Sequence, residues 1–233
     1  MESVRWRSAR LVLLLTAAYA YSQYVPFDPN GPLGPGVKGA PFSGEIVTES
    51  VQTLADGTHI RSGTRGRGLR DSAGRTREEI ELSPMAGDKG EKFSQVMIID
   101  PVQRVHISLN QVEKTATIQR TDLGVRIVSD TPPGISVRRK QPGEKDLGTM
   151  AIEGLTVRGR SFTHVTEVGR VGNDKPFSNV HEEWFSSDLK IVLITKDESP
   201  YTGQDVWKLI NISVGEPDAA LFQIPTDYKV IQQ

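Results

Sequence analysis

The chain has 233 residues, with 28 Lys+Arg against 29 Asp+Glu and a formal net charge of −1 at pH 7. This balance provides no overall positive field, so nucleic acid is not expected as a partner. Cysteine is absent, which excludes disulfides, thiolate zinc sites, a cysteine nucleophile and a lipid-modified cysteine. Hydrophobic residues make up 36% and aromatics 6%, so we expect a thin core rich in β-branched side chains.

Residues 1–20 have the layout of a secretory signal peptide. A basic lead precedes an apolar run over 11–18, and a small-x-small cleavage signal follows at Ala18-Tyr19-Ala20; the lead contains Arg5, Arg7 and Arg10. The run is too short to cross a bilayer. We therefore predict a periplasmic or secreted mature protein that begins near Tyr21 and has no transmembrane segment.

The segment 21–41 is rich in proline and glycine and is predicted to be an extended linker. From residue 42 to 231 the apolar residues alternate with period two, which predicts one antiparallel β domain. Its first hairpin joins strands at 45–54 and 58–69 through Asp56-Gly57, a dipeptide suited to the positive φ angles of a tight turn.

Further strands are predicted over 76–82, 93–99, 105–109, 115–119, 155–168, 180–186, 190–195 and 205–212. Residues 83–92 form a polar loop in this interpretation. A long, flexible, polar connection at about 121–148 separates two groups of strands within the one domain. Little helix is expected outside the signal peptide, apart from a single turn over 216–222 with Pro217 near its start.

Three parts of the sequence resemble a group of uncharacterised exported bacterial proteins. They are Arg-Asp-Ser-Ala-Gly-Arg-Thr-Arg-Glu-Glu at 70–79, Ile-Ile-Asp-Pro at 98–101 with Ile-Ser-Leu at 107–109, and Glu-Trp-Phe-Ser at 183–186 with Leu-Phe-Gln-Ile-Pro-Thr-Asp-Tyr at 221–228. The ending also resembles domains related to the periplasmic lipoprotein carrier and lipoprotein-sorting fold. The resemblance implies a mainly β, single-domain fold with a curved antiparallel sheet of the half-barrel type.

In the lipoprotein-carrier fold, helices plug the sheet and a lipid chain lies in its concave cavity. This chain departs from that pattern because covering helices are not evident in its sequence. Envelope stress sensors that use the same fold to detect misplaced lipoproteins provide a second analogy. Both analogies concern the fold more than the function.

An arginine stripe is the first candidate surface. Arg61, Arg65 and Arg67 have the same parity on one strand and so point to one face of the sheet. They could bind an anion or an acidic patch of a partner. Alternatively, they pair with Glu45 or with the acidic strand at 78–81; if Leu54 pairs with Thr58, Glu45 lies opposite Arg67.

The tryptophans Trp184 and Trp207 are the second candidate. They could line a hydrophobic ligand cavity, or they could supply the bulk of a core that is short of aromatics. Sequence alone favours the core.

No catalytic set or cofactor motif is evident. The glycines at 63, 66 and 68 precede no helix, so they do not form a phosphate loop. The four histidines are scattered singly (His59, His106, His164 and His181), so no metal site is expected. Ser72 belongs to a turn rather than to a nucleophile elbow.

We therefore expect a non-enzymatic exported envelope protein, without cofactors, that binds a lipid or acyl chain or another envelope protein on a curved sheet. The alternative is a structural or sensing module that contacts its partner through strand edges and loops and takes no small ligand.

Overall fold

The computed structural model describes residue 33 and residues 37–82, 93–120 and 143–232. The expected signal peptide, most of the expected linker, the polar loop at 83–92 and the connection at 121–142 lie outside these residues. Within the described part of the chain, no helix is long and apolar enough to cross a membrane.

Twelve strands and one short 3-10 helix are formed by the described residues. They are β1 (Phe42–Thr53), β2 (His59–Arg70), β3 (Thr76–Leu82), β4 (Phe93–Asp100), β5 (Val105–Asn110), β6 (Thr115–Arg120), β7 (Glu144–Ile152), β8 (Leu155–Thr166), β9 (Phe177–Ser186), β10 (Ile191–Ser199), β11 (Gly203–Val214), η1 (Ala219–Phe222) and β12 (Lys229–Gln232).

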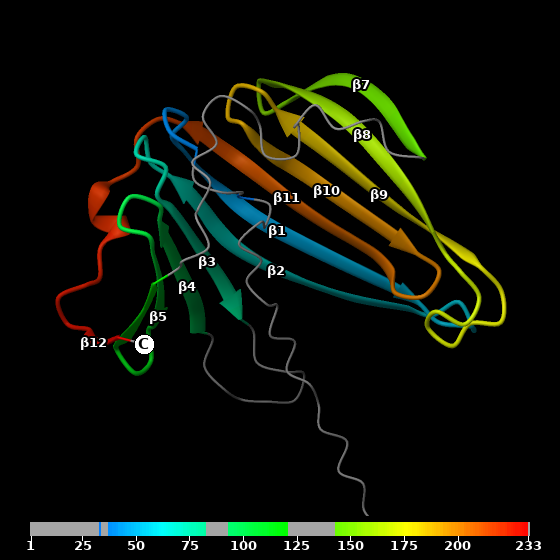
Figure 1. The fold of residues 1–233 in the computed structure, drawn as a ribbon, viewed down its shortest axis with the longest axis horizontal. Helices are drawn as coiled ribbons and strands as arrows, with labels where there is room; N and C mark the ends of the chain where they lie inside the picture. The colour runs from blue at the N-terminus through cyan, green and yellow to red at the C-terminus, as the bar shows by residue number, and fades with distance from the viewer. Residues whose placement is uncertain (1–32, 34–36, 83–92, 121–142, 233) are drawn as a thin grey trace, which may run out of the picture.

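All twelve strands belong to one open, curved sheet, which Figure 1 shows bending from β7 at one edge to β12 at the other. Its order is β12-β6-β5-β4-β3-β2-β1-β11-β10-β9-β8-β7. The expected mainly β fold with a curved sheet is thus confirmed. One pair departs from the antiparallel pattern, because β12 runs parallel to β6.

The first hairpin has the register in which Leu54 pairs with Thr58, which the sequence left open against a slip of one residue. Thr58 accepts a backbone hydrogen bond from the Leu54 amide at 2.8 Å, and Gly57 has φ +85°. The Asp56 carboxylate accepts from the Thr58 amide at 2.9 Å, which fixes the turn further. As a result Glu45 lies directly opposite Arg67.

Two hydrophobic clusters form the core. The β1 cluster contains Leu33, Phe42, Ile46, Val157, Leu189, Ile191, Leu193 and Leu209. The β4 cluster contains Leu69, Val96, Ile98, Ile107, Leu109, Ala116 and Phe222. Residues of η1 and of the C-terminal segment pack against the β4 cluster, so the chain covers this apolar surface with its own end.

Strand β7 begins inside the stretch that the sequence assigns to the polar connection. Its residues are almost all exposed, and among the described strands it pairs only with β8. A strand that buries neither face has no apolar alternation, which is why the period-two pattern does not reveal it.

Candidate functional site

A row of polar side chains crosses the sheet on either side of Trp207. The β1–β11 register places Thr48 opposite Trp207, and the β10–β11 register places Thr195 on its other side. Side chains directly opposite each other in antiparallel strands lie on the same face. The row continues to Thr64 on β2 and to Glu183 on β9.

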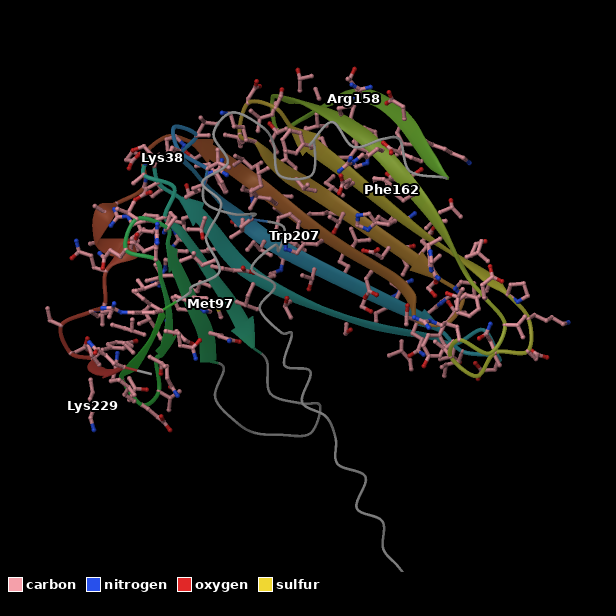
Figure 2. All side chains as sticks on the ribbon, in the orientation of Figure 1. Lys38, Met97, Arg158, Phe162, Trp207 and Lys229 are labelled. Carbon is pink, nitrogen blue, oxygen red and sulfur yellow. The ribbon has the colours of Figure 1, made fainter. Side chains whose placement is uncertain are left out.

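Two hydroxyl groups of this row are held in place, those of Thr48 and Thr64. Thr48 Oγ1 lies 2.8 Å from Thr64 Oγ1 and also accepts a hydrogen bond from the Thr64 amide at 2.9 Å. Trp207 itself is half-buried and packs against the β1 cluster. Figure 2 shows Trp207 over the central strands, far from both edges of the sheet.

A second polar row runs beside the first, two residues further along each strand. It joins Ser62, Ser50, Asp205, Asp197 and His181 by direct cross-strand pairing. Together the two rows define what we call the polar face: Thr48, Ser50, Ser62, Thr64, Glu183, His181, Thr195, Asp197, Asp205 and Trp207.

Ion pairs order the end of the polar face at β8 and β9. His181 Nδ1 lies 2.7 Å from Asp197 Oδ1, and His181 Nε2 lies 3.6 Å from Glu183 Oε2. Arg160 donates to Glu183, and its guanidinium lies 4.9 Å from the centre of the Phe162 ring. The polar face therefore ends in a network whose charges alternate in sign.

Hydrogen bonds to Asp197 and Glu183 raise the pKa of His181 to about 9, so this histidine is a cation at neutral pH. Burial opposes ionisation of Glu183, but hydrogen bonds from His181 and Arg160 outweigh it and lower the pKa of that carboxyl. A protonated imidazole held between two carboxylates is suited to a fixed charge rather than to a general base.

The three arginines of the predicted stripe do lie on one face and are exposed. Arg67 lies between Glu45 on β1 and Glu79 on β3. Arg61 and Arg65 face Val51 and Val47 instead. Arg67 is thus a cross-strand neighbour of two carboxylates, but the ion pair of Glu79 is with Arg77, and a partner surface at the three arginines stays a prediction.

Trp184 lies away from the two polar rows. Its ring covers Gly159, where an added Cβ would lie 2.6 Å from the indole, and its Nε1 donates to Glu182 at 2.7 Å. Like Trp207, it packs against the β1 cluster. A role for either tryptophan in binding stays a prediction.

Apolar side chains are exposed at one end of the sheet. The turn at 54–58, the loop at 167–176 and the turn at 200–202 lie together there (Figure 1), because they connect strands that are neighbours in the sheet. We call this set the apolar loop end: Leu54, Ile60, Val165, Val168, Val171 and Tyr201. Phe177 and Tyr201 link two of its loops, with ring centres 6.5 Å apart.

The four histidines do not assemble. His59 bonds to Thr53, His181 belongs to the polar face, and burial lowers the pKa of His106. No group of three or more metal-ligating side chains is found among the described residues.

No protein-family model and no curated protein matches the chain. Among solved structures, a chain of the Pseudomonas aeruginosa MucA/MucB complex is similar with a TM-score of 0.41 and 14% identity, over 83% of this chain and 59% of that chain. LprF from Mycobacterium bovis is similar with a TM-score of 0.35 and 11% identity, over 82% of this chain and 91% of that one.

A LolA superfamily protein from Nitrosomonas europaea is similar with a TM-score of 0.33 and 12% identity, over 78% of this chain and 90% of that chain. Because these identities and TM-scores are low, they assign no ligand or partner, and the function proposed below rests on the residues of this chain.

Proposed function

We propose that the chain is a non-enzymatic exported protein that binds another envelope protein through the apolar loop end. The observation that carries this proposal is the distribution of exposed apolar side chains. Of the thirteen large apolar residues exposed in the described part of the chain, six gather at this end of the sheet: four lie on the three neighbouring turns and loops, and Ile60 and Val165 lie on the adjacent ends of β2 and β8. The other seven are spread over two separate turns, the two edge strands and the end of β11. Exposed apolar groups that gather in one place favour an interaction surface.

The charge of the apolar loop end favours a protein over a membrane surface. Residues 53–60, 165–177 and 198–204, which exclude the polar face, contain four acidic and two basic side chains. An acidic surface is repelled by anionic lipid headgroups, whereas basic side chains around an apolar patch on a protein would complement it. We therefore take the partner to be a protein with an apolar patch and a basic rim.

An acyl chain, the other ligand class expected from the sequence, is less well supported. The fully buried apolar side chains pack on one another in the two clusters, and the cross-strand rows around Trp207 carry hydroxyl and carboxylate groups. A lipid tail gains free energy mainly from burying apolar area, at about 25 cal/mol per Å². Hydroxyl and carboxylate groups on the sheet provide little of that area.

The experiment is affinity capture and cross-linking in envelope extracts with a loop variant and a matched control. In the loop variant Val168→Ser, Val171→Ser and Tyr201→Ser remove three of the most exposed apolar groups. The control carries Val102→Ser and Val112→Ser, which are as exposed but lie on other turns.

We expect a discrete cross-linked partner with the wild type and with the control, reduced at least about tenfold with the loop variant. Equal capture by all three proteins would exclude the apolar loop end as the docking surface. A lipid that co-purifies in stoichiometric amount, without a protein partner, would favour the acyl-chain function instead.

A further inference from the structure

We propose that the polar face binds a carbohydrate, with one sugar ring stacked on Trp207. This surface is separate from the apolar loop end, and the inference does not depend on the protein partner. It rests on the groups that the sheet register places on either side of one half-buried indole.

Trp207 provides an aromatic surface on which a sugar ring can stack. A sugar ring offers one or both faces as a sheet of C–H groups with slight positive charge, and these lie against the negative face of an aromatic ring. Trp207 is half-buried, anchored against the β1 cluster on one side and still in part open to solvent. An indole that is held by the core keeps a fixed orientation, so little side-chain entropy is lost when a ring stacks on it.

Hydrogen-bonding groups flank the indole on both sides. Thr48 and Thr195 are its direct cross-strand neighbours, and Thr64 follows Thr48 in the same row. A threonine hydroxyl both donates and accepts, as sugar hydroxyls do. The mutual hydrogen bond of Thr48 and Thr64 at 2.8 Å fixes two of these hydroxyls before any ligand arrives.

Carboxylates complete the set in the adjoining row. Asp205 lies opposite Asp197, and His181 holds Asp197 by a contact of 2.7 Å. Carboxylates are strong acceptors for the two vicinal hydroxyls of a sugar. They also disfavour phosphate-bearing ligands and nucleic acid, whose negative charge they would repel.

Other ligand classes fit the polar face less well. An acyl chain would leave the hydroxyls and carboxylates desolvated and unpaired, which is unfavourable for each group. A divalent cation has no suitable group of ligands among the described residues. An aromatic platform with fixed hydroxyl and carboxylate groups on an exposed sheet is best matched by a neutral oligosaccharide.

The test is calorimetric titration of the purified mature protein with three neutral tetrasaccharides: chitotetraose, cellotetraose and maltotetraose. We expect at least one to bind. Trp207→Ala should weaken that binding at least about tenfold, and Trp207→Phe should weaken it less, because a smaller ring still stacks. Thr195→Val and Asp205→Asn should each weaken it severalfold.

Two variants serve as controls. Arg61→Ala changes a strand position that belongs to neither polar row, and the loop variant described above removes the proposed protein-docking groups. Both should bind the sugar as the wild type does. If Trp207→Ala fails to fold, Thr195→Val and Asp205→Asn decide the question.

Three outcomes would overturn the proposal. They are no binding of any tetrasaccharide at millimolar concentration, binding that Trp207→Ala leaves unchanged, and binding that only the loop variant abolishes. The two proposals can fail separately. If no sugar binds but the protein partner is still captured, only the carbohydrate proposal fails; if sugar binds but no protein is captured, only the proposed function fails.

Discussion

Arg70 is a buried cation whose hydrogen bonds all go to backbone carbonyls in the described part of the chain. Its Nε and Nη2 donate to the Ala40 carbonyl at 3.0 and 2.8 Å, and Nη2 also donates to the Leu189 carbonyl. Its guanidinium lies 4.9 Å from the Phe42 ring centre, and burial lowers its pKa to about 10. Arg70 thus joins the segment before β1 to the turn between β9 and β10.

Arg70→Ala should lower the free energy of unfolding by about 3 kcal/mol, because it leaves a cavity and two carbonyls without donors. Arg70→Met should cost less, since it refills the space and removes a desolvated charge. Urea denaturation measures both, with exposed Arg61→Ala as a control near zero. Equal losses for alanine and methionine would show that packing contributes nothing at this position.

His181 makes the stability depend on pH in a defined window. Its pKa is raised from 6.5 to about 9, so its contribution to stability is fully present below pH 6.5 and is lost as pH rises through 9. Because its side chain is 38% exposed, solvent screening limits the effect to about 1 kcal/mol.

Thermal unfolding of wild type and His181→Gln at several pH values between 6.5 and 9 checks this prediction. As the pH rises from 6.5 to 9, the wild type should lose more stability than His181→Gln does. The control variant His59→Gln should lose as much stability as the wild type. A stability difference between wild type and His181→Gln that stays constant with pH would contradict a charged His181 in the network.

At the level of the elements, the C-terminal segment covers the β4 cluster. Asp218 caps η1 by accepting from the Ala220 amide at 2.9 Å, and Arg77 Nη1 donates to the Leu221 carbonyl at 3.0 Å. Phe222 is buried in the β4 cluster, with the Arg75 guanidinium 5.1 Å from its ring centre. These contacts hold a short helix that could not form alone.

Phe222→Ala should therefore destabilise the protein by about 3 kcal/mol. Because the two clusters are separate, loss of hydrogen-exchange protection should concentrate in β4 to β6 and spare β10 and β11. Asp218→Ala, which removes only the cap, should cost about 1 kcal/mol. Protection lost evenly over all strands would mean that the two clusters unfold as one unit.

The elements also show where sequence reasoning succeeds and where it does not. The first hairpin was predictable as a hairpin, because Asp56-Gly57 fixes the turn, but its register was left between two alternatives, and the structure has the one that pairs Glu45 with Arg67. β7 was not predictable, because its nine residues bury neither face and it contains Gly148 at a bulge. The pairing of β12 with β6 joins distant parts of the chain and leaves no local signal.

The polar face could not be predicted from the sequence either, because it also depends on pairing between distant parts of the chain. It requires the registers of several strand pairs at once, and a slip of one residue in any of them moves the side chains to the opposite face. Trp207 shares a face with Asp205 because both belong to one predicted strand, but nothing local connects it to Thr48 or Thr195. Arg61, Arg65 and Arg67 were correctly placed on one face because they share a single strand.

At the scale of the whole molecule, one curved sheet carries the core, the polar face and the apolar loop end at different places. Its apolar side chains form two clusters, its central strands carry the polar face, and the loops at one end expose apolar groups. A single-layer sheet has surface to spare for binding, because few of its residues are covered on both faces. The loops at that end can therefore change without disturbing the core, whereas the polar face is tied to the core through Trp207.

Native mass spectrometry of the protein purified from the envelope of producing cells tests the central claim most directly. If the chain is a binding protein that docks through the apolar loop end, the wild type should carry the added mass of one protein partner, and the Val168, Val171 and Tyr201 variant should not. A wild type that instead retains the mass of a lipid, equally in both proteins, would contradict the account.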